Sequence, residues 1–309
     1  MQLPQPDRPA HMDVSNTVDV TDPVTVEAEV RAILESRYPG FDFSPLQVLF
    51  RDFTAHYAGE FPGFRACDIK YHDAQHVLDV TLAMARLLDG HEHRPGAPGA
   101  LLGPELALAG VAAALFHDSG YIRRTRDTRN KNGAAYTRIH VSRSERFMSE
   151  YLPTVGLQHM AGICRRIVHF TGYERDTRTL AVADGREQRL GTLLGTADLI
   201  AQMADVNYVT KCRDHLYEEF EIGGMAGVGA LPHHTGKVYH SRDHLLESTP
   251  RFIRDAIELR LEGEFDGVHR YAAAHFGGRN LYMDAIFENC MRLQRLLASS
   301  PAAVAVVQR

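Results

Sequence analysis

Two adjacent polar residues, His117 and Asp118, follow an apolar run in the segment A-L-F-H-D-S-G-Y, residues 114–121. Burying an imidazole and a carboxylate at the end of an apolar helix costs free energy unless both groups gain a partner. A divalent metal ion is such a partner, because it accepts a neutral histidine nitrogen and a carboxylate oxygen together. The pair therefore predicts a metal centre, and other parts of the chain should supply further ligands.

Candidate ligands of the same types stand before and after this pair, each in or beside an apolar segment. In Y-H-D-A-Q-H-V-L-D-V, residues 71–80, His72 and His76 are four residues apart, so a helix beginning near His72 places both on one side. Helical bundles build metal sites from inward side chains of several helices, so we expect the candidates to converge. The predicted metal ligands are His76, His117, Asp118, His140, His169 and Asp198.

A basic segment follows the His-Asp pair directly and supplies candidate phosphate ligands. It reads R-R-T-R-D-T-R-N-K, residues 123–131. Arginine forks match phosphate oxygens in two-point hydrogen bonds. Arg123 and Arg124 in this run, and Arg143 one turn after His140, are therefore candidate substrate-binding residues. The alternative is that the run forms a solvated loop with no ligand.

The hydrophobic pattern around the candidate ligands is helical. Apolar residues recur at helical spacing in successive segments, and no strong alternating pattern appears, so we predict an all-α fold. The predicted helices span residues 24–38, 45–57, 73–88, 104–119, 142–151, 158–171, 190–205, 207–221, 242–262, 264–275 and 280–299. Gly90 is the expected C-terminal cap of the third of these helices.

The same pattern predicts a single main domain. Residues 1–23 are polar and are expected to form a disordered leader, whereas residues 300–309 form a C-terminal tail. Residues 24–299 are expected to form one all-α domain, with a metal-binding core over about residues 71–221. The glycine-rich segment 222–241 is long for a compact domain, which favours a lid or a mobile loop. The helices after Arg242 would either complete the pocket around the metal centre or form a dimer surface, so a homodimer remains one of the two alternatives.

The composition excludes several classes of protein. The formal net charge is −5, so no overall basic charge attracts nucleic acid. The four cysteines form no C-x-x-C pair, and the longest apolar run is too short to cross a membrane. With no apolar signal segment in the leader, we expect a cytoplasmic protein. Histidine, with 17 copies among 309 residues, suits metal binding and acid–base chemistry.

The order of His76, then His117 with Asp118, then Asp198 resembles that of the HD-domain metal-dependent phosphohydrolases. The segment Y-H-D-A-Q-H-V-L-D-V is also similar to the signature Y-H-N-x-x-H-x-x-D-V of cyclic-nucleotide phosphodiesterases, and E-E-F-E-I-G-G, residues 218–224, is similar to a later segment of them. The resemblance covers about half of the chain, residues 71–221. Phosphodiesterases read H-D-x-D-H where this chain reads H-D-S-G-Y. That departure counts against a cyclic nucleotide as the substrate and leaves a nucleotidase, or a phosphodiesterase for another small ester, open.

The resemblance implies an HD-domain helical bundle and a role for each matched residue. The implied ligands of the first metal are His76, His117, Asp118 and Asp198. Asp118 would bridge to a second metal, for which His140 and His169 lie where binuclear members often place ligands. The implied cofactor is one or two divalent ions, Mn²⁺, Fe²⁺, Zn²⁺ or Mg²⁺. The implied substrate is a small-molecule phosphoester, a phosphodiester or a nucleotide.

In such a centre the metals lower the pKa of a water molecule and neutralise the charge on the phosphoryl group. The resemblance makes His72 the general acid that protonates the departing oxygen. The ligand order also resembles that of mixed-valent diiron oxygenases built on the HD scaffold, which cleave a C–C or C–P bond with O₂. A third possibility is a non-catalytic binding module that keeps the scaffold.

Overall fold

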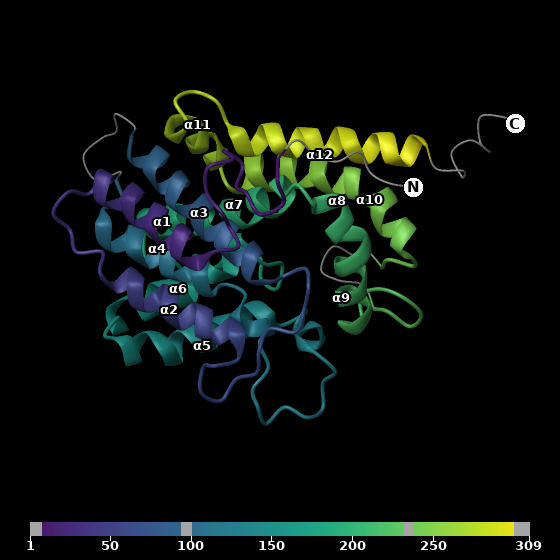
Figure 1. Ribbon diagram of the computed structural model, residues 1–309, viewed down its shortest axis with the longest axis horizontal. Helices are drawn as coiled ribbons and strands as arrows, with labels where there is room; N and C mark the ends of the chain where they lie inside the picture. The colour runs from purple at the N-terminus through teal and green to yellow at the C-terminus, as the bar shows by residue number, and fades with distance from the viewer. Residues whose placement is uncertain (1–7, 94–100, 232–237, 300–309) are drawn as a thin grey trace, which may run out of the picture.

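A computed structural model describes residues 8–93, 101–231 and 238–299 (Figure 1). Within these ranges the fold is all-α, as predicted, and extended pairing is limited to isolated bridges such as Phe64 with Arg124. The α-helices are α1 (Pro23–Arg37), α2 (Pro45–Ala58), α3 (Ala74–Glu92), α4 (Pro104–Phe116), α5 (His140–Tyr151), α6 (Gln158–Ile167), α7 (Gly185–Ala204), α8 (Tyr208–Lys211), α9 (Tyr217–Ile222), α10 (Arg242–Asp255), α11 (Tyr271–His275) and α12 (Leu281–Ala298). Residues 1–7 of the predicted leader and the predicted tail, residues 300–309, lie outside the described residues.

Short 3-10 turns and π-helical segments join several of these helices. The 3-10 turns are η1 (Ser119–Tyr121), η2 (Gly133–Tyr136), η3 (Leu152–Val155), η4 (Val168–Phe170), η5 (Thr177–Thr179) and η8 (Val268–Arg270), and the π-helices are η6 (Cys212–Leu216) and η7 (Ala256–Glu264). In the described ranges, no helix combines the length and the apolar character that crossing a bilayer requires.

Three helices, α3, α4 and α7, pack against one another at the centre of the core. Helix α3 is buried along nearly its whole length because α1 and α11 cover it as well. In Figure 1 the helices α1 to α6 gather on one side, while α8, α9 and α10 stand on the other. His76 lies in the first turn of α3, His117 directly follows α4, and Asp198 lies within α7. The core packing therefore brings three distant parts of the sequence to one place.

Gly90 does not cap α3, contrary to the sequence-based expectation. The helix continues to Glu92, and Gly90 is buried inside it. A Cβ atom on Gly90 would lie 1.9 Å from the carbonyl oxygen of Tyr271, the first residue of α11. Glycine is needed here for the close approach of two helices, because any side chain would push α11 away.

The predicted helix over residues 264–275 is interrupted. Asp266 and Gly267 both adopt positive φ angles, of 56° and 64°, in which a helix cannot continue. By contrast, α7 begins five residues earlier than predicted. Its N-cap is Asp184, whose carboxylate accepts hydrogen bonds from the backbone N–H groups of Arg186 and Glu187.

Residues 8–22 are ordered, so the predicted disordered leader is wrong for this part of the chain. Val18 and Val20 are buried in the core. Asp13 is buried as well, and its carboxylate accepts backbone hydrogen bonds from Ser15, Thr17 and Val18. The polar composition of residues 8–22 did not indicate an ordered loop, because the ordering depends on one buried carboxylate and two apolar side chains.

The Asp13 carboxylate also pairs with a fully buried arginine. Arg86 donates to Asp13 Oδ2 over 2.7 Å and to the Tyr282 hydroxyl over 3.1 Å. Burial alone would raise the pKa of Asp13, but the Arg86 charge and the hydrogen bonds from Ser15 and Val18 together lower it to about 2.

We predict that Asp13→Ala lowers the free energy of unfolding by about 3–5 kcal/mol, because it leaves a buried arginine without its counter-charge. Urea unfolding at pH 7 measures this change. Since the pKa of Asp13 is depressed in the folded state, the pair stabilises the fold above the unfolded-state value of about 3.9 and loses its effect as the pH falls toward 2. The difference in the free energy of unfolding between the wild type and Asp13→Ala should therefore become smaller in acid. Equal stability of the two proteins at pH 7 would contradict a stabilising role of the Asp13–Arg86 pair.

Candidate metal centre

Four side-chain atoms converge where the ends of α3 and α4 meet α7. The Asp118 Oδ2 atom lies 3.5 Å from His76 Nε2 and 3.3 Å from His117 Nε2. The Asp198 Oδ1 atom lies 3.4 Å from His76 Nε2 and 3.8 Å from His117 Nε2. All four residues are buried. The structure thus brings together the four ligands expected for a first metal.

The chemistry of these atoms fits a divalent cation. Within the described residues, His76 Nε2, His117 Nε2 and Asp118 Oδ2 are buried and have no hydrogen-bond partner. Their separations exceed ordinary hydrogen-bond lengths of about 2.7–3.2 Å. Metal–ligand bonds of about 2.0–2.2 Å place neighbouring ligand atoms roughly 3–3.6 Å apart, close to the spacing seen here. These three residues can therefore hold a metal ion, and Asp198 extends the set.

Local structure orients the two imidazoles before any metal binds. Asp73 caps α3 by accepting a hydrogen bond from the backbone N–H of His76, which fixes that residue in the first turn. His117 Nδ1 donates to the carbonyl oxygen of Ala114 over 2.7 Å. When the imidazole is neutral, this bond keeps the proton on Nδ1 and leaves Nε2, which faces the centre, free to bind a metal ion.

Asp118 lies between His140 on one side and His76 with His117 on the other. His140 Nδ1 donates to the carbonyl oxygen of Thr137, and its Nε2 lies 3.7 Å from Asp118 Oδ1. Asp118 therefore presents one oxygen to His76 and His117 and the other to His140. Although burial raises the pKa of Asp118, the neighbouring His117 and His72 hold it far below its usual range, so the carboxylate stays charged.

His169, the sixth predicted ligand, does not join this cluster. Its side chain is buried, but Nε2 lies 2.8 Å from Glu145 Oε2 on α5. Helix α6 ends at Ile167 and the chain tightens into the 3-10 turn η4, which changes the direction of the side chains that follow. These contacts do not support His169 as a ligand, although its Nδ1 atom is buried and has no hydrogen-bond partner among the described residues. Glu145 could not be singled out from the sequence, because it looks like any other charged residue of an amphipathic helix.

His72 is held next to the metal ligands by a carboxylate that sequence reasoning left without a role. Its Nδ1 lies 2.7 Å from Glu219 Oε2, and Glu219 Oε1 accepts the backbone N–H groups of Lys70 and Tyr71. The His72 ring stacks on Tyr121 at 4.6 Å between centroids. Burial alone would lower the pKa of His72, but Glu219 and Asp118 raise it. Glu219 lies in the segment E-E-F-E-I-G-G, and the similarity of this segment to cyclic-nucleotide phosphodiesterases could have indicated a functional role for it.

The cluster opens into a pocket of about 160 Å³. His72, Asp118, His140 and Asp198 lie on one part of its wall. The rest is largely aromatic: Tyr71, Tyr121, Tyr173, Tyr208, Phe220, Tyr239 and Phe252. None of the described residues that line it is a lysine or an arginine. In the glycine-rich segment, Met225 and Tyr239 contribute to this wall, while residues 232–237 lie outside the described ranges.

The three candidate substrate arginines do not reach this pocket. Arg123 donates to Asp68 Oδ2 over 2.7 Å, and Arg124 pairs with Glu150 over 2.7 Å. Arg143 donates to the carbonyl oxygens of Gly120 and Ile122. Arg143 lies with Ser119, Gly120 and Ile122 along a different cavity, on the other face of the 119–122 turn. The expectation that these arginines hold a substrate at the metal centre is therefore withdrawn.

Gly120 in the H-D-S-G segment permits a close contact on which the site depends. A Cβ atom there would lie 1.8 Å from the carbonyl oxygen of His140. We predict that Gly120→Ala displaces the turn carrying Asp118 and weakens Mn²⁺ binding by at least about 10-fold, the size typical for disturbed supports of metal ligands. Calorimetric titration measures this. Gly162→Ala, whose new methyl group would meet nothing closer than 3.5 Å, is the control, and equal affinities would contradict the prediction.

Comparisons with known proteins do not place this chain in a family. It matches no protein-family model, and no curated protein is significantly similar to it. Its function must therefore be inferred from the geometry of the site.

Proposed function

We propose that this protein is a metal-dependent phosphohydrolase of the HD type, acting on a small phosphodiester. The observation that carries the proposal is the convergence of three buried, unpartnered ligand atoms from His76, His117 and Asp118. His72, a histidine held by a carboxylate, lies beside them. A metal site next to an oriented acid–base group is the arrangement that phosphoester hydrolysis requires.

Each residue then has a physical task. A divalent ion held by His76, His117, Asp118 and Asp198 would supply a lowered pKa for a water molecule and neutralise phosphoryl charge. Glu219 occupies Nδ1 of His72, so the proton available to a substrate is the one on Nε2. His72 lines the same pocket as Asp118 and can pass that proton to the departing oxygen.

The pocket wall favours a substrate of low charge. With no lysine or arginine among its described lining residues, phosphoryl charge can be balanced only by the metal centre and His72. A phosphodiester carries a single negative charge, whereas a monoester or a polyphosphate carries more. The aromatic side chains can pack against apolar or heterocyclic substituents of the ester. A small phosphodiester satisfies both conditions, whereas a whole nucleotide needs more room than the 160 Å³ of this pocket, because small-molecule sites typically measure about 300–1,000 Å³.

The oxygenase alternative has weaker support, because the resemblance on which it rests involves six ligands. Five of the six predicted side chains lie at the centre, whereas His169 pairs with Glu145. A non-catalytic binding module is also disfavoured, because no residue of the predicted four-ligand set has been replaced.

Turnover assays separate these functions. Protein reconstituted with Mn²⁺ or Fe²⁺ is offered bis(p-nitrophenyl) phosphate, a panel of nucleotide diesters and a set of compounds with cleavable C–P or C–C bonds, while alcohol release and O₂ consumption are recorded together. We expect hydrolysis without O₂ uptake. Substrate-dependent O₂ uptake on C–C or C–P substrates would overturn the proposal in favour of the oxygenase. Metal retention with no turnover of any compound would favour a binding module.

A conservative variant of His169 tests the ligand set directly. We predict that His169→Gln keeps the metal stoichiometry and changes the hydrolysis rate by less than about 3-fold, because glutamine can still donate to Glu145. Elemental analysis of the purified variant measures the first quantity. Loss of one metal equivalent with an unchanged melting temperature would restore His169 as a ligand.

A further inference from the structure

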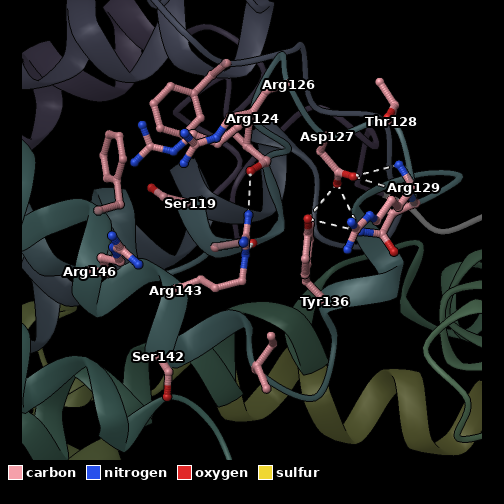
Figure 2. A pocket seen from close by; sticks show the side chains of 16 residues that line it. Ser119, Arg124, Arg126, Asp127, Thr128, Arg129, Tyr136, Ser142, Arg143 and Arg146 are labelled. Atoms are coloured by element: carbon pink, nitrogen blue, oxygen red, sulfur yellow. Dashed lines mark hydrogen bonds between the residues drawn. The ribbon is translucent and has the colours of Figure 1, made fainter.

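A second pocket, of about 990 Å³, lies on the opposite face of the turn that carries Asp118 (Figure 2). It shares none of its lining residues with the metal pocket. Five arginines line it: Arg124, Arg126, Arg129, Arg143 and Arg146. In Figure 2, Arg124, Ser119 and Arg146 stand on one side and Arg129 on the other, with Arg143 between them.

The positive charge of this pocket is only partly balanced. Asp127 is the one acidic residue among the described lining residues. Its Oδ2 atom accepts hydrogen bonds from Tyr136 over 2.6 Å and from Asn130 over 3.0 Å. Within the described part of the chain, the guanidinium groups of Arg126 and Arg129 form no hydrogen bond and no ion pair. Two free cations therefore remain available for an anion.

Arg143 and Ser119 form the base of the pocket. The Arg143 guanidinium lies 3.5 Å from the centre of the Tyr136 ring and donates to the Gly120 carbonyl oxygen over 2.6 Å, so it is fixed in place. The Ser119 hydroxyl has no hydrogen-bond partner among the described residues, although the residue is only 2% exposed. A buried hydroxyl without a partner costs free energy, which a ligand oxygen at this position would recover.

We propose that this pocket binds a small phosphorylated ligand that is distinct from the substrate of the metal centre. Fixed and free arginines around a buried hydroxyl match the several oxygens of phosphate groups. The volume lies within the range of about 300–1,000 Å³ found for small-molecule sites. The chain as a whole is acidic, with a net charge of −5, so the positive charge is local and favours a small anion over a nucleic acid.

Calorimetric titration with pyrophosphate tests this proposal. The titration is done in excess EDTA, so that metal-mediated binding at the other pocket cannot contribute. We expect saturable binding of one equivalent by the wild-type protein and by Asp198→Asn, which alters only the metal pocket. Binding by Arg126→Ala/Arg129→Ala should be at least about 10-fold weaker, because two charge-assisted hydrogen bonds to the ligand are lost.

Arg251→Ala/Arg254→Ala is the matched control, since it removes two exposed arginines of α10 and changes the net charge equally. It should bind pyrophosphate like the wild type. Absence of saturable binding, or equal weakening in both double variants, would overturn the proposal. Tighter binding of a single-stranded oligonucleotide than of pyrophosphate would overturn the assignment to a small ligand. None of these outcomes depends on hydrolytic activity.

Discussion

Purified Asp118→Asn protein should carry less than about one tenth of the wild-type metal and should lose on the order of 10³-fold or more of its hydrolytic activity. The two oxygens of Asp118 face different histidines of the cluster, Oδ2 toward His76 and His117 and Oδ1 toward His140. Asparagine keeps the shape but removes the negative charge that brings the imidazoles and a cation together. A loss of several kcal/mol of charge stabilisation corresponds to such a factor in rate.

The measurement is elemental analysis combined with steady-state kinetics, and far-UV circular dichroism checks that the helices persist. Asp176→Asn is the matched control, because this exposed aspartate pairs only locally, with Arg178. It should retain both metal and activity. Wild-type turnover by Asp118→Asn would show that the chemistry takes place elsewhere.

The substitution His72→Asn should cause a large loss of hydrolysis rate, and the size of this loss should depend on the leaving group of the substrate. The asparagine amide can still donate to Glu219, so the local fold is kept, but no proton can reach the departing oxygen. General acids contribute about 10²–10⁴-fold to rate. We expect a loss of about 100-fold or more for aryl diesters with weakly acidic phenols, and less than about 10-fold for p-nitrophenyl esters, whose leaving group needs no proton.

The test is a series of methyl aryl phosphodiesters whose phenols differ in pKa. The logarithm of the hydrolysis rate is plotted against the pKa of the phenol, and the slope should be steeper for the variant than for the wild type. A uniform loss across the series would assign His72 to binding or orientation. Glu219→Gln should move the slope in the same direction but less, because Glu219 acts through His72 as a positioning residue.

The sequence contained most of the metal centre, because ligand identity and helical periodicity are local properties. The all-α fold and the helices that carry His76 and Asp198 follow from apolar spacing alone. The adjacent pair His117 and Asp118 stood out because a charged pair at the end of an apolar helix needs a partner.

What the sequence could not supply was the direction of side chains at helix ends. His169 turns toward Glu145 because one 3-10 turn follows α6, and no pattern in the sequence predicts that tightening. Arg143 donates to the carbonyl oxygens of Gly120 and Ile122, a tertiary contact that no spacing in the sequence indicates. The contact that makes glycine necessary at residue 120 is likewise tertiary.

Anomalous diffraction from a crystal soaked in Mn²⁺ tests the central claim most directly. We expect a strong peak within roughly 2.0–2.4 Å of His76 Nε2, His117 Nε2, Asp118 Oδ2 and an oxygen of Asp198. A second, weaker peak is expected between Asp118 Oδ1 and His140 Nε2. A fully soaked crystal with no peak among these four side chains, or with Mn²⁺ bound only elsewhere, would contradict the metal centre and the hydrolytic function proposed for it.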